Sequence, residues 1–330
     1  MAGLTSIGND LYTGARSIDF IRRRRLWYLV SAIAILLSIV VPILRGGYQF
    51  GIEFTGGSEF TVSDVGTDQD TGVRAAQSVT GPEVQPIASV VGGDSIRIQT
   101  TQLDTNGSTT RSDRVAAALA SAYDVPASRV TSSFIGPTWG ADITGSAIRG
   151  LLIFLVLVAL VMAVYFRTWK MAAAGLVALI HDLIITAGVY GIIGFEVTPA
   201  AVIGFLTILG YSLYDTVVVF DKIRENTAGL NRGSSRTFGE TVNLAVNQTL
   251  VRSINTSIVG LLPIASVLFI GTTLLGAGTL RDISLALFVG ILVGTYSTIF
   301  VAAPLYVDLR STEPAIKQQA KQALALRAGA

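Results

Sequence analysis

The sequence predicts a multi-pass α-helical membrane protein with six transmembrane helices and one extracytoplasmic α+β domain between the first two helices. The mean hydropathy is +0.59 and only 14% of the residues are charged, whereas soluble domains carry about 25% charged residues. The apolar residues gather in runs that are long enough to cross a membrane. One polar stretch, Arg45–Ala141, contains no such run and is long enough to form a small domain.

Composition excludes several kinds of site. The chain has no cysteine, which excludes disulfides, thiolate nucleophiles and cysteine-based metal sites, and its single histidine excludes a multi-histidine metal site. A formal net charge of +2 is too small to indicate a nucleic-acid partner. The sequence has no GxSxG or HExxH motif and no phosphate loop ending in GKS or GKT. We therefore expect neither an enzyme nor a bound cofactor.

The first transmembrane helix is expected at Leu26–Leu44, which has nineteen residues and no charge. The polar N-terminal segment, residues 1–25, ends in the four arginines Arg22–Arg25. By the positive-inside rule such a cluster stays in the cytoplasm, and Trp27 and Tyr28 lie where an interfacial aromatic belt would be. Because the apolar run follows a polar segment and has no small-residue cleavage site, we expect it to remain as an anchor.

The polar stretch that follows contains alternating strand patterns and helical patterns. The expected elements are a strand at Phe50–Ser63 broken by Gly56-Gly57, a helix at Val73–Val79, strands at Glu83–Val91 and Ser95–Thr100 joined by a Gly92-Gly93-Asp94 hairpin, a helix at Ser112–Tyr123 and a strand at Arg129–Ile135. The βαββαβ order predicts a ferredoxin-like α+β sandwich at residues 45–145. No ligand-binding residues stand out there, so we interpret it as an interaction domain.

Five more spans are expected in a bundle at residues 146–307. Each has an apolar core that can cross a hydrocarbon layer of ~30 Å. These spans are Gly150–Phe166, Met171–Ile193, Pro199–Phe220, Ser253–Leu275 and Ile283–Val307. A cytoplasmic loop is expected at 221–251 and a cytoplasmic tail at 308–330.

The distribution of lysine and arginine predicts the orientation. The N-terminal segment, the 167–170 turn, residues 221–251 and the tail hold five, two, four and four of these residues. The short connections on the other side, 194–198 and 276–282, hold only Arg281. The positive-inside rule therefore places both termini in the cytoplasm and the α+β domain outside.

Asp215 is the main candidate for a functional residue, because it is an acid inside the fourth expected span. A charged side chain at the centre of a membrane helix costs about 2.5–3.5 kcal/mol on insertion scales, so such residues are usually paired, protonated or turned towards a cavity. Arg252, at the start of the fifth span, stays charged, whereas an aspartate can exchange a proton. The two residues form the candidate proton path. The alternatives are a structural pair at Asp215 and a snorkelling side chain at Arg252.

Further polar residues lie near this candidate path. Tyr211 and Ser212 precede Asp215 by about one helical turn, and Asn255 shares a polar face of the fifth span with Arg252. Such a face is expected to point to a protein interior or a cavity rather than to lipid. These residues belong either to the proton path or to helix packing.

Two motifs in other spans allow two interpretations each. His181 and Asp182, near the centre of the third span, form either a proton relay or a hydrogen bond that packs helices, and the sequence favours packing. Gly290 and Gly294 form a GxxxG pattern in the sixth span, which also favours helix packing over chemistry.

The motifs of this chain, taken together, resemble one known family. They are IDFIRRRRLWY before the first span, GIEFTGG at 51–57, FIGPTWGAD at 134–142, HD at 181–182, GYSLYDTVVVFDKIREN at 210–226, NQTLVRSINTS at 247–257 and GTLRDISLALFVGILVGTYSTIFVA at 278–302. Over nearly the whole chain, their order and spacing resemble the SecF subunits of the SecD/SecF family, which belongs to the resistance-nodulation-division (RND) superfamily.

The resemblance implies a fold, a function and partners. The chain would be half of an RND-type transporter in the bacterial plasma membrane, with SecD as the other half. The pair uses proton-motive force to help the SecYEG channel in late translocation and release of preproteins, with SecA, YajC-type subunits and membrane lipid as further partners. Asp215 matches the family's transport acid, and Arg252 matches its arginine at the start of span five. We expect Asp215 to face the SecD half.

Two other functions stay open from the sequence. A proton-coupled RND-type exporter of small molecules or lipids would share the transport acid, but is expected to have two outer domains and twelve spans in one chain, or to form a substrate-dependent homo-oligomer. A non-transporting scaffold that stabilises the channel would tolerate a conservative change at Asp215.

Overall fold

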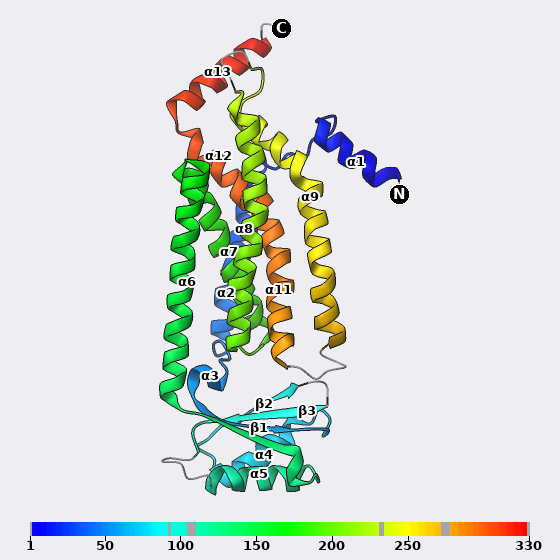
Figure 1. Cartoon of the computed structure of the whole chain (residues 1–330), viewed down its shortest axis with the longest axis vertical. Helices are drawn as coiled ribbons and strands as arrows, with labels where there is room; N and C mark the ends of the chain where they lie inside the picture. Colours follow the sequence, from blue (N-terminus) through cyan, green and yellow to red (C-terminus); the bar gives the residue numbers. More distant parts are fainter. Residues whose placement is uncertain (1, 92–93, 104–109, 231–233, 272–277, 329–330) are drawn as a thin grey trace.

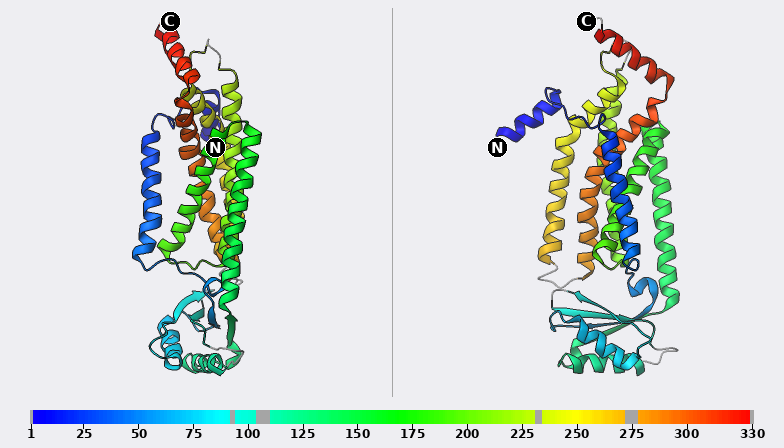
Figure 2. Two further views of the ribbon diagram at one scale, coloured as in Figure 1. Left: turned by 90° about the vertical axis from the view of Figure 1, so that its left-hand side faces the viewer. Right: turned by 180° about the vertical axis from the view of Figure 1, so that it is seen from behind.

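The chain forms an elongated helical bundle with a small sheet domain at one end (Figure 1). The computed structural model describes residues 2–91, 94–103, 110–230, 234–271 and 278–328. Both chain ends lie at the end of the bundle opposite to the sheet domain, as the further views also show (Figure 2). We call these two ends of the molecule the terminal side and the domain side.

Six helices of the described residues are long and apolar enough to cross a membrane. They are α2 (Arg24–Leu44), α6 (Pro137–Phe166), α7 (Trp169–Ile193), α8 (Pro199–Ala228), α9 (Phe238–Ser266) and α11 (Gly278–Ser297). Helix α9 continues as the π-helical segment η2 (Val267–Gly271), and α11 continues as the π-helical segment η3 (Thr298–Ala302) and then α12 (Ala303–Ser311). The predicted multi-pass α-helical fold is confirmed.

The sheet domain contains antiparallel strands in the order β2-β3-β1-β4. Its elements follow each other as β1 (Gly57–Val62), α4 (Gln69–Thr80), β2 (Ile87–Val91), β3 (Ser95–Thr100), α5 (Thr110–Ala122), η1 (Ala127–Arg129) and β4 (Val130–Ile135). Phe60, Val62, Ile96 and Ile98 alternate along β1 and β3 and are buried in one core cluster with residues of α4 and α5. These two helices cover the sheet face that points away from the bundle (Figure 1). The predicted ferredoxin-like sandwich is confirmed.

The entry into the sheet differs from the single bulged strand expected at Phe50–Ser63. The chain first forms the short helix α3 (Ile52–Thr55), and then turns at Gly56 and Gly57, whose φ angles are 71° and 145°. Glycine adopts such angles without a steric penalty. A Cβ atom at Gly57 would also overlap the carbonyl oxygen of Thr100. The two glycines therefore separate a helix from a strand.

Strands β2 and β3 pair as expected, with Ala88 opposite Ile98. Strand β2 begins at Ile87 rather than at Glu83, because Pro86 has no backbone N–H group to donate to a ladder. The glycines of the expected hairpin, residues 92–93, lie outside the described residues.

Helices α8 and α9 extend beyond their apolar runs, so the segment 221–251 is not a loop over its whole length. It is helical except between Gly229 and Thr237, where residues 231–233 lie outside the described residues. Helix α9 starts early because Thr237 and Glu240 form a capping box, in which the Thr237 N–H donates to the Glu240 carboxylate at 2.8 Å.

Other boundaries also differ from the expected ones. Helix α6 begins at Pro137, within the region expected for the outer domain, because proline suits the first position of a helix. The tail expected at 308–330 contains the end of α12 and the helix α13 (Pro314–Ala328). The expected end of the fifth span, Leu275, lies outside the described residues.

The segment before the four arginines is fastened to the bundle. After helix α1 (Ala2–Thr13), the Ile18 N–H donates to Asn247 Oδ1 at 2.8 Å, and the Phe20 N–H donates to Asn243 Oδ1 at 2.9 Å. Phe20 is buried among apolar side chains of the bundle. These asparagines of α9 therefore fix the path of the chain into α2, in addition to any topological role of the arginines.

Small residues bring α8 and α11 into close contact. A Cβ atom at Gly290 of α11 would overlap the Ile208 side chain, and one at Gly204 of α8 would lie 2.6 Å from the Ala286 Cβ atom. Gly294 faces α8 in the same way. The helix-packing interpretation of the GxxxG pattern is confirmed.

We predict that Gly290→Ala lowers the free energy of unfolding by about 1–3 kcal/mol, because the new methyl group overpacks the contact with α8. The matched control is Gly150→Ala on α6, where a Cβ atom meets nothing within 4 Å. The control should be neutral or slightly stabilising, because alanine favours helix over glycine. Thermal unfolding in detergent measures both variants, and equal unfolding curves would contradict the packing described for α8 and α11.

Candidate functional site

Asp215 lies near the middle of α8 and its side chain is buried, with 6% of the residue exposed. Its Oδ1 atom accepts a hydrogen bond of 2.8 Å from the Ser253 hydroxyl of α9. Its Oδ2 atom is buried and has no hydrogen-bond partner among the described residues. A buried carboxyl group with one free oxygen is poorly satisfied as a carboxylate, since a buried unpaired polar group costs about 1–3 kcal/mol. The Oδ2 atom is therefore the position of this site that is free to bind a proton.

Arg252 lies beside this site without forming an ion pair to Asp215 among the described residues. Its side chain is exposed at the surface of α9, where Nη2 makes a long contact of 3.5 Å to the Tyr214 hydroxyl. The partner of Asp215 is thus the neutral hydroxyl of Ser253, which the sequence did not single out. Arginine side chains are long, so Arg252 can reach other groups without movement of the backbone.

Two other candidates near Asp215, Tyr211 and Asn255, lie in different surroundings. The Tyr211 hydroxyl donates to the Thr256 carbonyl oxygen at 2.8 Å and packs against Gly260, so it joins α8 to α9. Asn255 is exposed on the surface of α9. The described geometry gives Tyr211 a packing role and leaves Asn255 at the surface.

His181 and Asp182 are both buried in α7, with 3% and 0% of the residue exposed. His181 Nδ1 lies 3.1 Å from Asp182 Oδ1, and the Ser212 hydroxyl of α8 donates to Asp182 Oδ2 at 2.6 Å. The Tyr296 ring of α11 stacks on the His181 ring, with 6.0 Å between ring centroids. The sequence thus identified Ser212 as a candidate, and the structure places it on Asp182 rather than on Asp215.

One face of the bundle near Asp215 is open in the single chain and carries polar side chains among apolar ones such as Ile203 and Ile254. Tyr214 is 54% exposed, and Thr207 and Gly210 lie on the same exposed side of α8. Arg252 and Asn255 are exposed on the neighbouring α9. Polar groups on a membrane-spanning surface are rarely left in contact with lipid.

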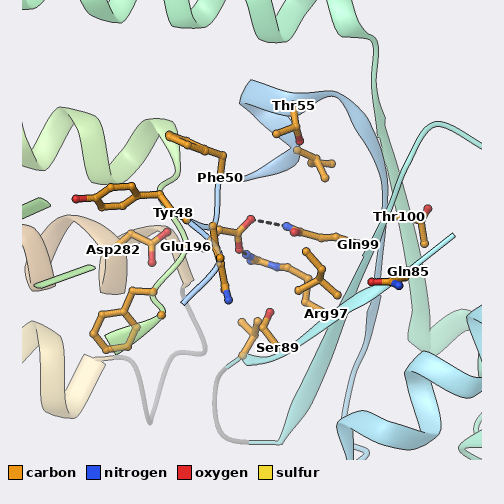
Figure 3. A pocket seen from close by; sticks show the side chains of 18 of the residues that line it. Tyr48, Phe50, Thr55, Gln85, Ser89, Arg97, Gln99, Thr100, Glu196 and Asp282 are labelled. Atoms are coloured by element: carbon orange, nitrogen blue, oxygen red, sulfur yellow. Dashed lines mark hydrogen bonds and ion pairs between the residues drawn. The ribbon is translucent and has the colours of Figure 1, made fainter. Parts of the chain in front are cut away.

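A second polar site lies on the domain side, between the sheet and the ends of the helices (Figure 3). A cavity of about 690 Å³ is lined there by β2, β3, the α7–α8 connection and the start of α11. Arg97 of β3 lies 3.2 Å from Glu196 and 3.5 Å from Glu59, and Gln99 also donates to both glutamates. No motif marks this cluster in the sequence, because its polar members are distributed between the sheet domain and the α7–α8 connection.

Charge and burial act together in this cluster. Burial raises the pKa of the Glu53 carboxyl group, and the negative charges of Glu196 and Glu59 raise it further. The pKa of Arg97 is raised by the same two glutamates, although its burial acts in the opposite direction. The Arg97 guanidinium group therefore lies between an acid of the sheet domain and an acid of the bundle.

Backbone hydrogen bonds fasten the sheet domain to the start of α8. The Val197 N–H donates to the Gln49 carbonyl oxygen at 2.7 Å, and the Gly51 N–H donates to the Val197 carbonyl oxygen at 3.0 Å. The next residue, Thr198, caps α8 and donates its hydroxyl to Asp282 Oδ2 of α11 at 2.8 Å. Helices α8 and α11 are thus joined to the sheet domain close to their ends.

Among the described residues, no group of three or more His, Asp or Glu side chains could hold a metal ion.

Comparison with known proteins identifies the family of this chain. Residues 115–312 match the family described as protein export membrane protein SecD/SecF, C-terminal. A relative named protein translocase subunit SecF from Streptomyces coelicolor is 45% identical over 99% of this chain and 86% of its own length. The chain belongs to the SecD/SecF family. Another relative with the same name, from Mycobacterium tuberculosis, is 40% identical over 98% of this chain and 74% of its own length.

Solved structures of the SecD/SecF family have the same fold. A crystal structure of SecDF from Thermus thermophilus, titled a translocon-associated membrane protein, has a TM-score of 0.76 and 31% identity over 90% of this chain. A SecDF structure in a form called super-membrane-facing has a TM-score of 0.61 and 30% identity. The chain covers only 39% and 40% of the length of those SecDF chains.

We predict that Ser253→Ala lowers the free energy of unfolding by about 1–3 kcal/mol, because both oxygens of the Asp215 carboxyl group then lack a partner. The loss should vanish in an Asp215→Leu background, where Ser253 has no carboxyl group to serve. Ser266→Ala is the control, because the Ser266 hydroxyl is exposed and bonds only to its own helix. A double-mutant cycle by thermal unfolding measures the coupling, and additive losses would contradict the contact.

Proposed function

We propose that this chain is an accessory subunit of the Sec preprotein translocase, which uses proton-motive force together with a SecD partner to promote late translocation and release of preproteins. The observation that carries the proposal is the buried Asp215 carboxyl group, with one hydroxyl partner and one free oxygen inside a membrane-spanning helix. Membership of the SecD/SecF family supports the link to protein export. The energy source is a proton gradient, and no organic or metal cofactor takes part.

The proposed location is the bacterial plasma membrane, with both termini in the cytoplasm and the sheet domain outside. The excess of lysine and arginine in the segments of the terminal side supports this orientation. The Asp215 site then lies within the membrane, where a proton gradient can act on it.

The proposed partner on the open face of α8 and α9 is SecD. The chain aligns with about two fifths of each SecDF chain. The remaining part of a SecDF chain corresponds to a partner that would cover this face. Tyr214, Arg252 and Asn255 would then point into the interface between the halves instead of into lipid. Because Asp215 is buried next to this face, a proton reaches it from the interface. SecYEG, SecA, YajC-type subunits, preproteins and membrane lipid are further proposed partners, and nucleic acid is not.

The proposed coupling runs along α8. Protonation of Asp215 removes the negative charge that the Ser253 hydroxyl stabilises, and so changes how α8 packs on α9. Helix α8 begins at Thr198, next to the backbone bonds of Val197 with the sheet domain. The ion pair between Arg97 and Glu196 adds a second connection at the same place. A small shift of α8 would therefore move the sheet domain relative to the membrane.

We predict that Asp215→Asn abolishes the gradient-dependent part of preprotein translocation and leaves the ATP-driven part intact. Asparagine keeps the size and the hydrogen-bond acceptor for Ser253, but it cannot exchange a proton. The measurement uses vesicles that contain SecYEG, SecA and the SecD partner, with and without a proton gradient. Asp221→Asn is the control, because Asp221 is an exposed acid on the same helix.

Equal stimulation by the gradient in native and Asp215→Asn vesicles would contradict the proposal and support the scaffold function. Gradient-dependent efflux of a small molecule or a lipid, without an effect on preproteins, would instead support an RND-type exporter.

A further inference from the structure

The proposed function uses Asp215 but leaves a second buried acid unexplained. Asp182 is 0% exposed and lies in α7, next to His181, which is 3% exposed. Among the described residues, Asp182 and His181 form an ion pair with each other, and neither forms one with an arginine or a lysine. A buried carboxylate without a compensating charge is expensive in a membrane. The two side chains therefore have to be considered together.

A carboxylate at Asp182 beside a neutral His181 ring gives the pair one negative charge. One added proton makes the pair electrically neutral. The proton can sit on the Asp182 carboxyl group beside a neutral His181 ring, or on His181 beside a carboxylate. The 3.1 Å contact between His181 Nδ1 and Asp182 Oδ1 is a hydrogen bond in both forms. The Ser212 hydroxyl can donate to Asp182 Oδ2 in both forms as well. The geometry thus accepts a proton that moves within the pair.

Ser212 also places this pair next to Asp215. The two residues are three positions apart on α8, so their side chains leave the helix on neighbouring faces. Gly294 of α11 makes room there, since a Cβ atom on it would lie 3.0 Å from the Ser212 Oγ atom and 3.5 Å from Asp182 Oδ2. The Ser212 hydroxyl is hydrogen-bonded to Asp182 and not to Asp215, so it joins the two acids only when the free Asp215 Oδ2 atom turns towards it.

Two buried polar atoms without partners mark the ends of this polar series. They are Asp215 Oδ2 and His181 Nε2, neither of which has a hydrogen-bond partner among the described residues. Buried side-chain polar atoms are mostly hydrogen-bonded, so unpaired ones need an explanation. Beyond His181, the Tyr296 hydroxyl lies 3.2 Å from the Ser31 hydroxyl and donates to the Trp27 carbonyl oxygen. These contacts lead towards the terminal side.

We propose that His181 and Asp182 form a second proton-binding site, which exchanges a proton with Asp215 through the Ser212 hydroxyl. In the exchange, the protonated Asp215 carboxyl group turns its unpartnered Oδ2 atom to the Ser212 hydroxyl, which stays bonded to Asp182. The O–H bond of the Asp215 carboxyl group then breaks, and its proton forms a new bond to Ser212 Oγ. The original Ser212 proton passes to Asp182 Oδ2, so the hydroxyl is regenerated. One negative charge has then moved from the pair to Asp215, and the total charge is unchanged. This inference rests on the proposed function, because it extends the path that starts at Asp215.

The test compares proton uptake by proteoliposomes that contain the chain with its SecD partner and enclose a pH-sensitive dye. Asp182→Asn is the decisive variant, because asparagine can still accept from Ser212 and bond to His181 but cannot carry the proton. Thr186→Val is the matched control, since Thr186 is a buried polar residue on α7 whose hydroxyl has no partner among the described residues. Asp215→Asn is measured beside them, and thermal unfolding reports on the fold of every variant.

We expect Asp182→Asn to lower gradient-driven proton uptake by at least about tenfold, in line with the rate contribution of a positioned acid or base, while Thr186→Val stays native. Native uptake by Asp182→Asn, with uptake lost in Asp215→Asn, would overturn the second site and leave the proposed function intact. Native uptake by Asp215→Asn would overturn both. If Asp182→Asn does not fold, His181→Asn replaces it, with loss of uptake supporting the site and native uptake overturning it.

Discussion

The cost of an unpaired carboxyl group inside a membrane determines how this bundle is built around α8. Asp215 is shielded from lipid by α9, whose Ser253 hydroxyl is its one hydrogen-bond partner among the described residues. On the other side, glycines of α11 allow that helix to approach α8 so closely that Gly290 contacts Ile208. This close approach packs α11 against α8, while the hydrogen-bond partner of the acid is the small Ser253 hydroxyl of α9. A change in the charge of Asp215 must therefore be absorbed by the contacts of α8 itself.

The same helix is also where the membrane bundle meets the sheet domain. Val197 forms backbone hydrogen bonds with the segment that leads into the sheet, and Thr198 bonds to Asp282 of α11. Arg97 adds a charged contact between the sheet and Glu196. The acid and the sheet domain are thus connected by one continuous helix and a short set of polar contacts. Such an arrangement can transmit a displacement of α8 to the sheet domain.

The sequence could predict the features that depend on local pattern. Uncharged apolar runs revealed the spans, alternation revealed the strands, and an acid within an apolar run pointed to Asp215. Contacts between distant segments could not be predicted in this way. Ser253 is one of several hydroxyl residues in α9, and Arg97 is one of many polar residues in the outer domain. Only the packing of the helices brings Ser253 to Asp215, and only the docking of the sheet brings Arg97 to Glu196. Arg252 is a further example. The sequence predicted its place at the start of a span, but not that its side chain points to Tyr214 instead of Asp215.

The central claim is that the protonation state of Asp215 controls the position of the sheet domain. Because the chain has no cysteine, spin labels can be attached at two introduced cysteines, Ser121→Cys on α5 and Ser266→Cys near the domain-side end of α9, which are both exposed in the single chain. The distance between the labels is measured by pulsed electron paramagnetic resonance in the complex with SecD, for native Asp215 and for Asp215→Asn. The account predicts that the native distance distribution changes between high and low pH, and that Asp215→Asn keeps the low-pH distribution at both. A distribution that is the same for both chains at every pH would contradict it.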